Sequence, residues 1–249
     1  MGNAARGRSA LVTGSTRGIG RAVAQHLTAA GAQVVVHGRD EGSVRAAVAD
    51  GVGVAGAVGD VGEPGGAASI CAAAVAAVGP LEIVVNNAGT SVPGGFLRQA
   101  DDAWDRILAV NLLGTRDVLR ATLPAMREAG WGRIVNMTSE AGVRGTQGYA
   151  AYASAKGAVV ALTLTLALEL RGTGVTVNAL APLAATDLVR SQMTPEALAA
   201  LESRGLPSVD DCATEVLALV ADAAPTGQVR VMHPGGRPTE TVEAISMPG

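Results

Sequence analysis

Four polar side chains have the types and the spacing that proton transfer needs. Tyr152 and Lys156 are four residues apart in a segment of helical period, so they share one face of a predicted helix. A cation beside a phenol lowers the phenol pKa from about 10, which suits proton transfer near neutral pH. Ser139 follows a predicted strand, where it can hydrogen-bond a substrate oxygen. Asn111 is a poor helix former inside a predicted helix, which favours a polar role.

Composition singles out the same pair. The chain has 19 basic residues, of which Lys156 is the one lysine, and it has two tyrosines. Codon bias explains a preference for arginine, but a site that needs a compact ammonium cannot accept a guanidinium fork. Chance is the alternative, because a tyrosine four residues before a lysine is a common pattern. Tyr149 is followed four residues later by Ala153, so we interpret it as a pocket wall or packing residue.

A glycine-rich turn follows the first predicted strand and opens the first predicted helix. Glycines permit close approach of the backbone to phosphate, and the helix N-terminus offers free N–H groups to a pyrophosphate. The spacing is G-x3-G-x-G, and a purely structural turn is the alternative. The predicted dinucleotide-binding residues of this turn are Gly14, Ser15, Thr16, Arg17, Gly18, Ile19 and Gly20.

Charged residues after the second strand bear on which dinucleotide binds. An acidic residue there would hold the ribose 2′-hydroxyl of NAD, but positions 34–38 carry no carboxylate. Arg39 follows the strand and Arg17 lies in the glycine turn, and two guanidinium groups suit a 2′-phosphate. Asp40 can pair with Arg39 or bond the ribose itself, and Arg39 as a solvated surface residue is the alternative. The sequence therefore favours NADP(H) and leaves NAD(H) open.

Two further strand ends carry residues that suit a cofactor. Asp60 and Val61 follow the third strand, where Asp60 is expected either to bond the adenine edge or to cap the next helix. Asn87, Ala88 and Gly89 follow the fourth strand, where small residues let a cofactor lie close to the chain. A simple Asn/Gly turn is the alternative for this second segment.

Seven apolar runs of strand length alternate with longer stretches of helical period. The strands lack polar alternation, so both sheet faces are expected to be buried, which indicates a parallel sheet flanked by helices. We predict one α/β domain over residues 1–249, with a loose tail after Gly236. The predicted strands are residues 9–13, 33–37, 52–58, 81–86, 133–137, 175–180 and 228–232. The predicted helices are residues 18–30, 42–49, 66–78, 102–113, 115–129, 149–171, 195–204 and 209–223.

Composition argues against several other classes of protein. Net charge is −3, aromatic residues make up 2% and no long basic run occurs, so nucleic-acid binding is not expected. Cys71 and Cys212 are far apart and lack metal-ligand spacing, so we expect no metal site and a reducing, cytoplasmic location. The first residues hold no apolar signal region and no apolar run of about 20 residues occurs, so no signal peptide or membrane span is expected.

Together, in order and at matching spacing, these motifs resemble the short-chain dehydrogenase/reductase family over roughly residues 8–236. The resemblance is to the single-domain branch of 3-oxoacyl-carrier-protein reductases and polyketide ketoreductases. Pro182 and Thr186, after the sixth strand, extend the match as cofactor-binding positions. The resemblance implies a Rossmann-type, doubly wound parallel sheet of seven strands and a homotetramer or homodimer.

The resemblance also implies a role for each residue of the site. Ser139 would polarise the substrate carbonyl, and Tyr152 would deliver the proton. Lys156 would hold the nicotinamide ribose and acidify the phenol, Asn111 would hold a water that relays protons to Lys156, and Thr186 would bond the carboxamide. The hydride would come from the nicotinamide. The predicted function is the NADPH-dependent reduction of a ketone to a secondary alcohol. The ketone is expected to be of β-ketoacyl or polyketide type, with a carrier-protein or CoA thioester as one form of it.

Departures from the family pattern leave the substrate open. Leu183 stands where the family usually has glycine, and the substrate pocket is one place for its side chain. Residues of about 183–226 are expected to form a substrate lid, but they match the family weakly. The alternatives are an NAD+-dependent alcohol dehydrogenase, a non-redox isomerisation, elimination or cyclisation, and a dinucleotide-binding module without turnover. The predicted pocket residues are Phe96, Glu140, Gln147, Tyr149, Leu183 and Met193.

Overall fold

A single eight-stranded sheet forms the centre of the computed structural model, which describes residues 4–183, 194, 196, 199–200, 203, 205–234 and 238–243. The strand order is β3-β2-β1-β4-β5-β6-β7-β8; the first seven strands are parallel, and β8 is antiparallel to β7. The strands are β1 Ser9–Val12, β2 Gln33–Gly38, β3 Ala55–Val58, β4 Ile83–Asn86, β5 Gly132–Met137, β6 Val175–Ala181, β7 Gln228–Met232 and β8 Pro238–Glu243. The helices are α1 Gly18–Ala29, α2 Glu41–Ala49, α3 Gly66–Val78, α4 Asp101–Leu108, α5 Gly114–Ala129, α6 Glu140–Arg144, α7 Ala150–Glu169 and α10 Val209–Val220, with a 3-10 turn at Phe96–Arg98 and a π-helical turn at Ala109–Leu113.

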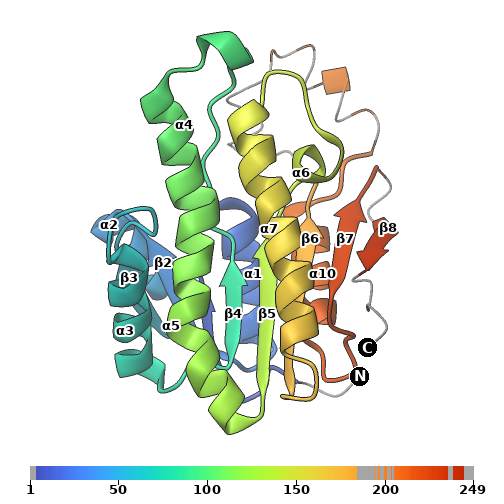
Figure 1. Ribbon diagram of the computed structural model, residues 1–249. Coiled ribbons are helices and arrows are strands. Elements are labelled where there is room, and N and C mark those ends of the chain that lie inside the picture. The colour runs from blue at the N-terminus through green and yellow to red at the C-terminus, as the bar shows by residue number, and fades with distance from the viewer. Residues whose placement is uncertain are drawn as a thin grey trace.

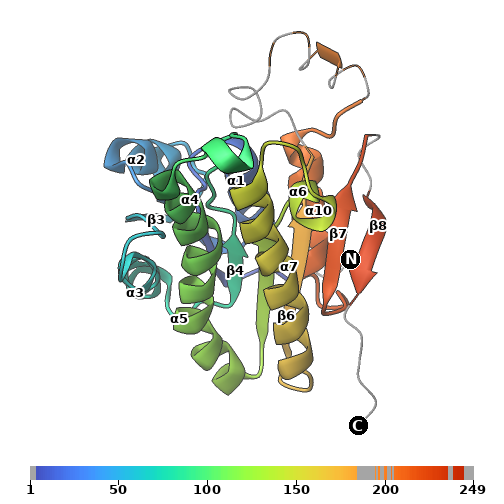
Figure 2. The same ribbon diagram turned by 45° about the horizontal axis from the view of Figure 1, so that its top comes forward.

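Helices cover both faces of the sheet (Figures 1 and 2). Val34 and Val36 of β2 belong to the hydrophobic cluster that includes α1, α2 and α10. Val35, which lies between them, belongs to the cluster on the other face, with α3 and α5. Successive side chains of a strand point to opposite faces, so an unbroken apolar strand supplies both clusters. This arrangement confirms the predicted doubly wound parallel sheet of a single α/β fold.

The strand order reverses at β1, which lies between β2 and β4. In open parallel sheets, ligands bind outside the carboxyl ends of the strands at such a reversal. Here the glycine turn between β1 and α1 and the segment after β4 meet at this point, at the upper edge of the sheet in Figure 1. The fold therefore brings the predicted cofactor-binding segments to one crevice.

Three elements differ from the sequence prediction. Residues 101–129 form one continuous helical segment in which a π-helical turn joins α4 to α5. A short helix, α6, follows β5, where no helix was expected. The tail expected to be loose instead contributes β8, which pairs with β7 through Val229 and Val242 and forms the edge of the sheet. The predicted helix at residues 195–204 lies largely outside the described residues.

The amino-terminal edge of the sheet is closed by an indole between two guanidinium groups. Trp131 precedes β5, and the Arg8 and Arg133 Cζ atoms lie 3.9 Å and 4.3 Å from the centre of its ring. Arg8 also pairs with Glu82, and Arg133 donates a hydrogen bond to the Gly174 carbonyl at 2.9 Å. These contacts tie the starts of four neighbouring strands, β1, β4, β5 and β6, together at the edge opposite the crevice.

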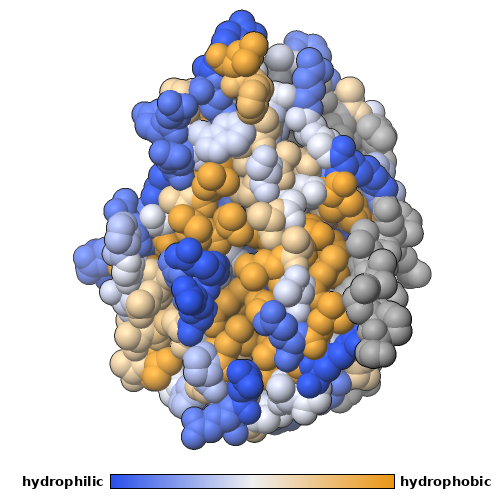
Figure 3. Space-filling model, viewed as in Figure 1, coloured by the Kyte–Doolittle hydropathy of each residue, from blue (hydrophilic) through white to orange (hydrophobic). Residues whose placement is uncertain are grey.

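Helix α7 is apolar over most of its length. Among the described residues it is the one helix long and apolar enough to cross a membrane by length and composition, and 33% of that window is buried. It packs against β6 and carries Tyr152 and Lys156, so the fold itself accounts for its apolar character. Figure 3 shows apolar side chains gathered on the face formed by α5 and α7. Helices α5 and α7 therefore leave a broad apolar face exposed.

Both cysteines are buried, as expected for small apolar residues of the core. Cys71 lies on α3 and Cys212 on α10, and both thiols are free. Burial raises the pKa of Cys71 to about 11 and that of Cys212 to about 12. Neither thiol has the lowered pKa that a nucleophile or metal ligand needs.

Candidate active site

Ser139 and Tyr152 are brought together by the short helix α6 and the start of α7. Ser139 follows β5 as the N-cap residue of α6, and its Oγ accepts a hydrogen bond from the Ala141 N–H at 3.2 Å. The same hydroxyl hydrogen-bonds the Tyr152 phenol in the first turn of α7. The predicted pairing of these two side chains at the end of β5 is therefore present.

The protonation of Tyr152 differs from the sequence expectation. Burial raises the pKa of its phenol, while the hydrogen bond with Ser139 acts in the opposite direction and the nearby Tyr149 adds to the rise. The expected lowering by Lys156 is absent, because Lys156 Nζ lies 5.7 Å from the centre of the tyrosine ring and donates to the Met137 carbonyl at 2.7 Å. Tyr152 is thus held as a neutral phenol, the form that can donate a proton.

Lys156 is fully enclosed by the fold. Its side chain extends from α7 toward the end of β5, and burial lowers the pKa of its ammonium to about 8. A lysine whose pKa lies close to physiological pH can both hold and release a proton, which a proton relay requires. The one lysine of the chain is therefore buried beside the Tyr152 phenol, with a backbone carbonyl as its hydrogen-bond partner.

Asn111 occupies the π-helical turn between α4 and α5. Its Nδ2 donates to the Thr90 carbonyl at 2.7 Å and to the Ile107 carbonyl at 2.9 Å. Its buried Oδ1 has no partner among the described residues. A Cβ placed on Gly89 would lie 2.8 Å from this oxygen and 3.7 Å from Lys156 Nζ. The bare glycine thus leaves a small polar space between Asn111 and Lys156, as a water-mediated relay needs.

The glycine turn has the geometry that a dinucleotide pyrophosphate requires. Gly14 and Gly18 adopt φ of +63° and +56°, in the left-handed region that favours glycine. A Cβ on Gly20 would lie 2.4 Å from Asn87 Nδ2, so a larger residue would force the turn and the β4 segment apart. No side chain caps the N-terminus of α1, which leaves its first N–H groups available for phosphate. These observations fit a dinucleotide.

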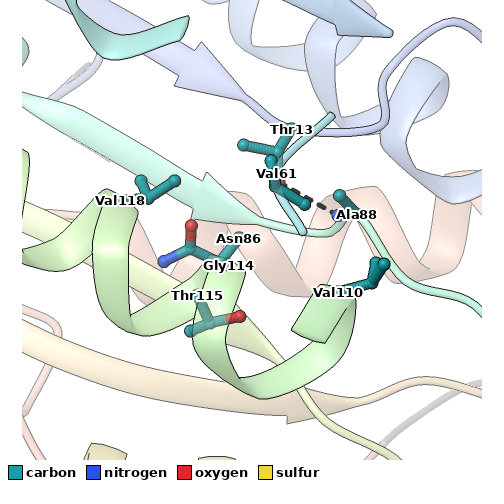
Figure 4. A pocket seen from close by; sticks show the side chains of 8 residues that line it. All are labelled: Thr13, Val61, Asn86, Ala88, Val110, Gly114, Thr115 and Val118. Atoms are coloured by element: carbon teal, nitrogen blue, oxygen red, sulfur yellow. Dashed lines mark hydrogen bonds between the residues drawn. The ribbon is translucent and has the colours of Figure 1, made fainter. Parts of the chain in front are cut away.

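The segment after β4 is locked to the glycine turn. Thr13 Oγ1 accepts hydrogen bonds from the N–H groups of Asn87 at 3.0 Å and Ala88 at 2.9 Å, the second of which is drawn in Figure 4. The Asn87 amide in turn donates to the carbonyls of Thr13 and Gly14, each at 2.9 Å. Asn87 therefore joins the two segments, and its amide nitrogen already has two backbone carbonyls as hydrogen-bond acceptors.

Sequence reasoning missed His37, whose partners also include Ser15. His37 is buried at the end of β2, where Nδ1 accepts from the Gly14 N–H at 3.0 Å and Nε2 lies 3.1 Å from the Gly59 carbonyl. Burial lowers the pKa of His37, so the ring is neutral. Ser15, predicted to bind the cofactor, is fully buried and hydrogen-bonds Val12 and His37. A single polar residue inside an apolar strand was the one signal for His37.

The charged residues around the adenosine end are engaged with one another. Asp40 caps α2, where its Oδ1 accepts from the Ser43 N–H and hydroxyl, each at 2.7 Å. Asp60 accepts a hydrogen bond from Arg106, and Arg39 Nη1 lies 3.8 Å from the same carboxylate. Burial raises the pKa of Asp60, but the hydrogen bonds and the two positive charges outweigh it and lower the pKa below its ordinary value. The carboxylate is therefore ionised and paired.

Of the remaining predicted cofactor residues, Val61 and Pro182 lie in the described part of the chain and Thr186 does not. Val61 is buried against α5, where a Cβ on Gly114 would lie 2.9 Å from its side chain, so its side chain belongs to the core. Pro182 is half-buried directly after β6. Thr186 lies outside the described residues, as does Met193 of the predicted substrate pocket.

The other predicted pocket residues are not all in one place. Tyr149 packs edge-on against Tyr152, with ring centres 6.4 Å apart, and a backbone bridge joins it to Gly94 in the loop after β4. Phe96, in that loop, is 68% exposed and packs edge-on against Trp104. Gln147 is exposed, and Glu140 pairs with Arg144 within α6 at 2.8 Å.

Leu183 is partly buried just after the end of β6. Its side chain packs against the hydrophobic cluster that includes Cys212 and Ala213 of α10. Burying an apolar side chain is favourable, so this contact gives Leu183 a packing role, and its place in the substrate pocket stays a prediction. The substitution of the usual glycine is thus accommodated by packing under α10.

A narrow void lies between the end of β4 and the start of α5. It is lined by Asn86 and Thr115 among apolar residues, and it has no room for a water molecule. Figure 4 shows the Asn86 side chain between the strand and the helix. Asn86 Nδ2 donates to Asn136 Oδ1 at 2.9 Å, so this amide joins neighbouring strands. The void is a packing seam behind the crevice.

Comparison with known proteins agrees with this geometry. A family model described as short chain dehydrogenase matches residues 8–197. D-beta-hydroxybutyrate dehydrogenase of Cupriavidus necator is 35% identical over 229 residues, covering 89% of this chain and 85% of that protein. The 3-oxoacyl-(acyl-carrier-protein) reductase FabG of Escherichia coli is 33% identical over 236 residues, covering 92% and 96%. A granaticin polyketide synthase putative ketoacyl reductase of Streptomyces violaceoruber is 41% identical over 181 residues, covering 70% and 66%.

These relatives are named as dehydrogenases and reductases, and among the described residues the glycine turn, the segment after β4 and Ser139 all follow carboxyl ends of the parallel strands. The match spans the strands β1 to β6 and the helices that hold the site. The chain therefore belongs to the short-chain dehydrogenase/reductase family and is an NAD(P)-dependent oxidoreductase that acts on hydroxyl or carbonyl groups.

Proposed function

We propose that this protein reduces a ketone, of β-ketoacyl or polyketide type, to a secondary alcohol with NADPH. The observation that carries the proposal is the neutral Tyr152 phenol, hydrogen-bonded by Ser139 and set beside the buried Lys156. The reductases FabG and granaticin ketoacyl reductase among the relatives support the direction of the reaction. A carrier-protein or CoA thioester is the proposed form of the substrate, and the cytoplasm the proposed location.

The mechanism follows from which atoms hold protons. Ser139 donates a hydrogen bond to the substrate carbonyl oxygen, with the Ala141 N–H orienting its hydroxyl. Tyr152 gives its proton to the same oxygen as negative charge develops there. Lys156 returns a proton to the phenol, and a water in the space beside Asn111 would in turn supply Lys156. The nicotinamide supplies the hydride when it is bound, and the glycine turn and α1 hold its pyrophosphate.

The preference for NADPH is proposed from charge at the end of β2. Arg39 is 71% exposed in its side chain and follows this strand directly, and Arg17 is exposed at the start of α1. Asp40 Oδ1 caps α2, which supports a structural role for this carboxylate over ribose binding. Two guanidinium groups with no free carboxylate between them suit a 2′-phosphate.

Oxidation of a secondary alcohol with NAD+ is the second candidate. The D-beta-hydroxybutyrate dehydrogenases among the relatives favour it, since the same residues can run the proton transfer in reverse. The deciding experiment titrates the purified protein with NADPH and NADH by nicotinamide fluorescence. It then follows NADPH consumption on a panel of ketones and β-ketoacyl thioesters, and NAD+ reduction on the matching alcohols.

Tight NADPH binding with ketone turnover is the expected result. A preference for NADH with alcohol turnover would replace the first candidate by the second. Products formed without net redox change would overturn both candidates and assign the site to isomerisation, elimination or cyclisation.

A further inference from the structure

The Asp60 carboxylate meets two arginines from different elements. Asp60 follows β3, and its Oδ1 accepts from the Gly62 N–H at 2.9 Å. Its Oδ2 accepts a hydrogen bond from Arg106 Nη2, on α4. Arg39 Nη1, after β2, lies 3.8 Å from this same oxygen, beyond hydrogen-bond distance. Arg106 therefore has the direct bond to the carboxylate, and Arg39 has only a loose ion pair with it.

The backbone around Arg106 favours its hold on Asp60. A Cβ on Gly62 would lie 2.9 Å from Arg106 Nη1, so the glycine lets the guanidinium lie directly against the loop after β3. Arg106 Nη1 is also 3.8 Å from Glu63 Oε1. The Arg106 side chain is 35% exposed and the Arg39 side chain 71% exposed. Arg106 is thus fixed on the loop, while Arg39 extends into solvent at the adenosine end of the crevice.

The second carboxylate beside Arg39 is also engaged. Asp40 accepts two hydrogen bonds from Ser43 at the start of α2. An arginine can grip a phosphate with its full fork of donors only if no carboxylate competes for that fork. Both potential competitors of a 2′-phosphate for Arg39 are therefore occupied by other partners, one by a helix start and one by Arg106.

We propose that Arg106 is a positioning residue for cofactor selection: by holding Asp60 it leaves Arg39 available to the 2′-phosphate of NADPH. The inference rests on the NADPH preference proposed above. Without Arg106, the Asp60 charge would draw Arg39 into a closer ion pair and would also repel the phosphate. NADH has no 2′-phosphate, so its binding does not depend on the freedom of Arg39.

The test compares dissociation constants for NADPH and NADH, measured by nicotinamide fluorescence at fixed ionic strength. In Arg106→Met we expect NADPH to bind about tenfold more weakly and NADH to bind within about twofold of the wild type. Arg106→Lys keeps a cation beside Asp60 and is expected to retain most of the NADPH affinity. Thermal unfolding of each variant checks that the fold is intact.

A second substitution separates charge from structure. Adding Asp60→Asn to Arg106→Met removes the competitor for Arg39, and we expect it to restore the ratio of the two dissociation constants. Any contact of Asp60 with adenine affects both cofactors alike, so it cancels in this ratio. Arg45→Met is the matched control, because Arg45 pairs with Glu41 on α2 at 3.6 Å and carries the same charge near the same edge. We expect it to leave the ratio unchanged.

Two results would overturn the role of Arg106: a ratio of the two dissociation constants that is unchanged in Arg106→Met, including equal weakening of both cofactors, or no restoration of the ratio by Asp60→Asn. The proposed function is tested separately by the ratio in the wild-type protein. A wild type that prefers NADH would overturn the NADPH proposal, whereas the change of the ratio between wild type and Arg106→Met would still report on Arg106.

Discussion

The Ser139 hydroxyl shows how one side chain can be oriented for catalysis by its own backbone surroundings. Its oxygen accepts from the Ala141 N–H, in the first turn of α6. The single hydroxyl proton is thereby directed away from the helix, toward the Tyr152 phenol and the proposed substrate oxygen. A helix cap thus also fixes the direction of a catalytic hydrogen bond.

The chain offers a matched pair of tyrosines for testing the proton donor. Tyr152→Phe is expected to lower ketone turnover by about 100-fold or more, because it removes the general acid, while NADPH binding stays within a few-fold. Tyr149→Phe, at the neighbouring ring, is expected to leave turnover within about threefold. Steady-state kinetics with a confirmed substrate, together with fluorescence titration, checks both. Full turnover in Tyr152→Phe would refute the proposed mechanism.

Burial of Lys156 opposes folding at neutral pH. Its pKa falls from 10.5 to about 8 in the folded protein, so the unfolded chain binds more protons between these values and stability rises with pH across that window. At pH 7 we therefore expect Lys156→Met to abolish turnover yet raise the free energy of unfolding by roughly 2 kcal/mol. The gain should shrink as the pH approaches 10.5. Urea unfolding of both proteins at pH 7 and pH 10 checks this, and a less stable variant would contradict it.

At the scale of elements, the contact between α6 and α7 sets the distance between Ser139 and Tyr152. Gly142 lies in α6 directly against the backbone of α7, and a Cβ there would lie 2.6 Å from the Lys156 carbonyl carbon. Neither helix can shift without moving one member of the catalytic pair. The absence of one side chain on α6 is thus as important to the site as the side chains present.

Gly142→Ala is therefore expected to separate the two helices. We expect turnover to fall by about tenfold and stability by about 1–3 kcal/mol, with NADPH binding retained, because the glycine turn lies on other strands. Gly42→Ala on α2 is the matched control: a Cβ there would meet only Asp40 Oδ1 at an ordinary 3.4 Å. Kinetics, titration and thermal unfolding of both variants check this. Equal loss of NADPH binding in Gly142→Ala would show a wider disruption than we expect.

The elements also show what sequence patterns can and cannot predict. The seven parallel strands and the glycine turn were predictable because apolar runs and helix starts are local features. The π-helical turn at Asn111 was not, because it arises from tertiary contacts of the Asn111 amide with Thr90. The strand β8 was missed because its pairing depends on the open edge of β7. The role of His37 was missed because its partners, Gly14 and Gly59, lie on other segments.

For the whole molecule, the apolar face of α5 and α7 predicts association. Large exposed apolar patches on a soluble enzyme mark interaction surfaces, and a second copy of the chain is the partner that the family resemblance implies. We expect a homotetramer or homodimer by size-exclusion chromatography with light scattering. Ala161→Glu, on the exposed side of α7, should shift the protein toward smaller species. A monomeric wild type would refute this prediction.

The indole held between Arg8 and Arg133 gives the protein a built-in optical marker at one end. The chain has two tryptophans, and the other, Trp104, lies on α4 beside Phe96, at the edge where the crevice opens. The environment of Trp131 depends on the starts of β1 and β5 remaining together, whereas Trp104 packs against Phe96 and is not part of that stack. Separation of the strand starts and movement of α4 therefore have different fluorescent reporters within the natural sequence.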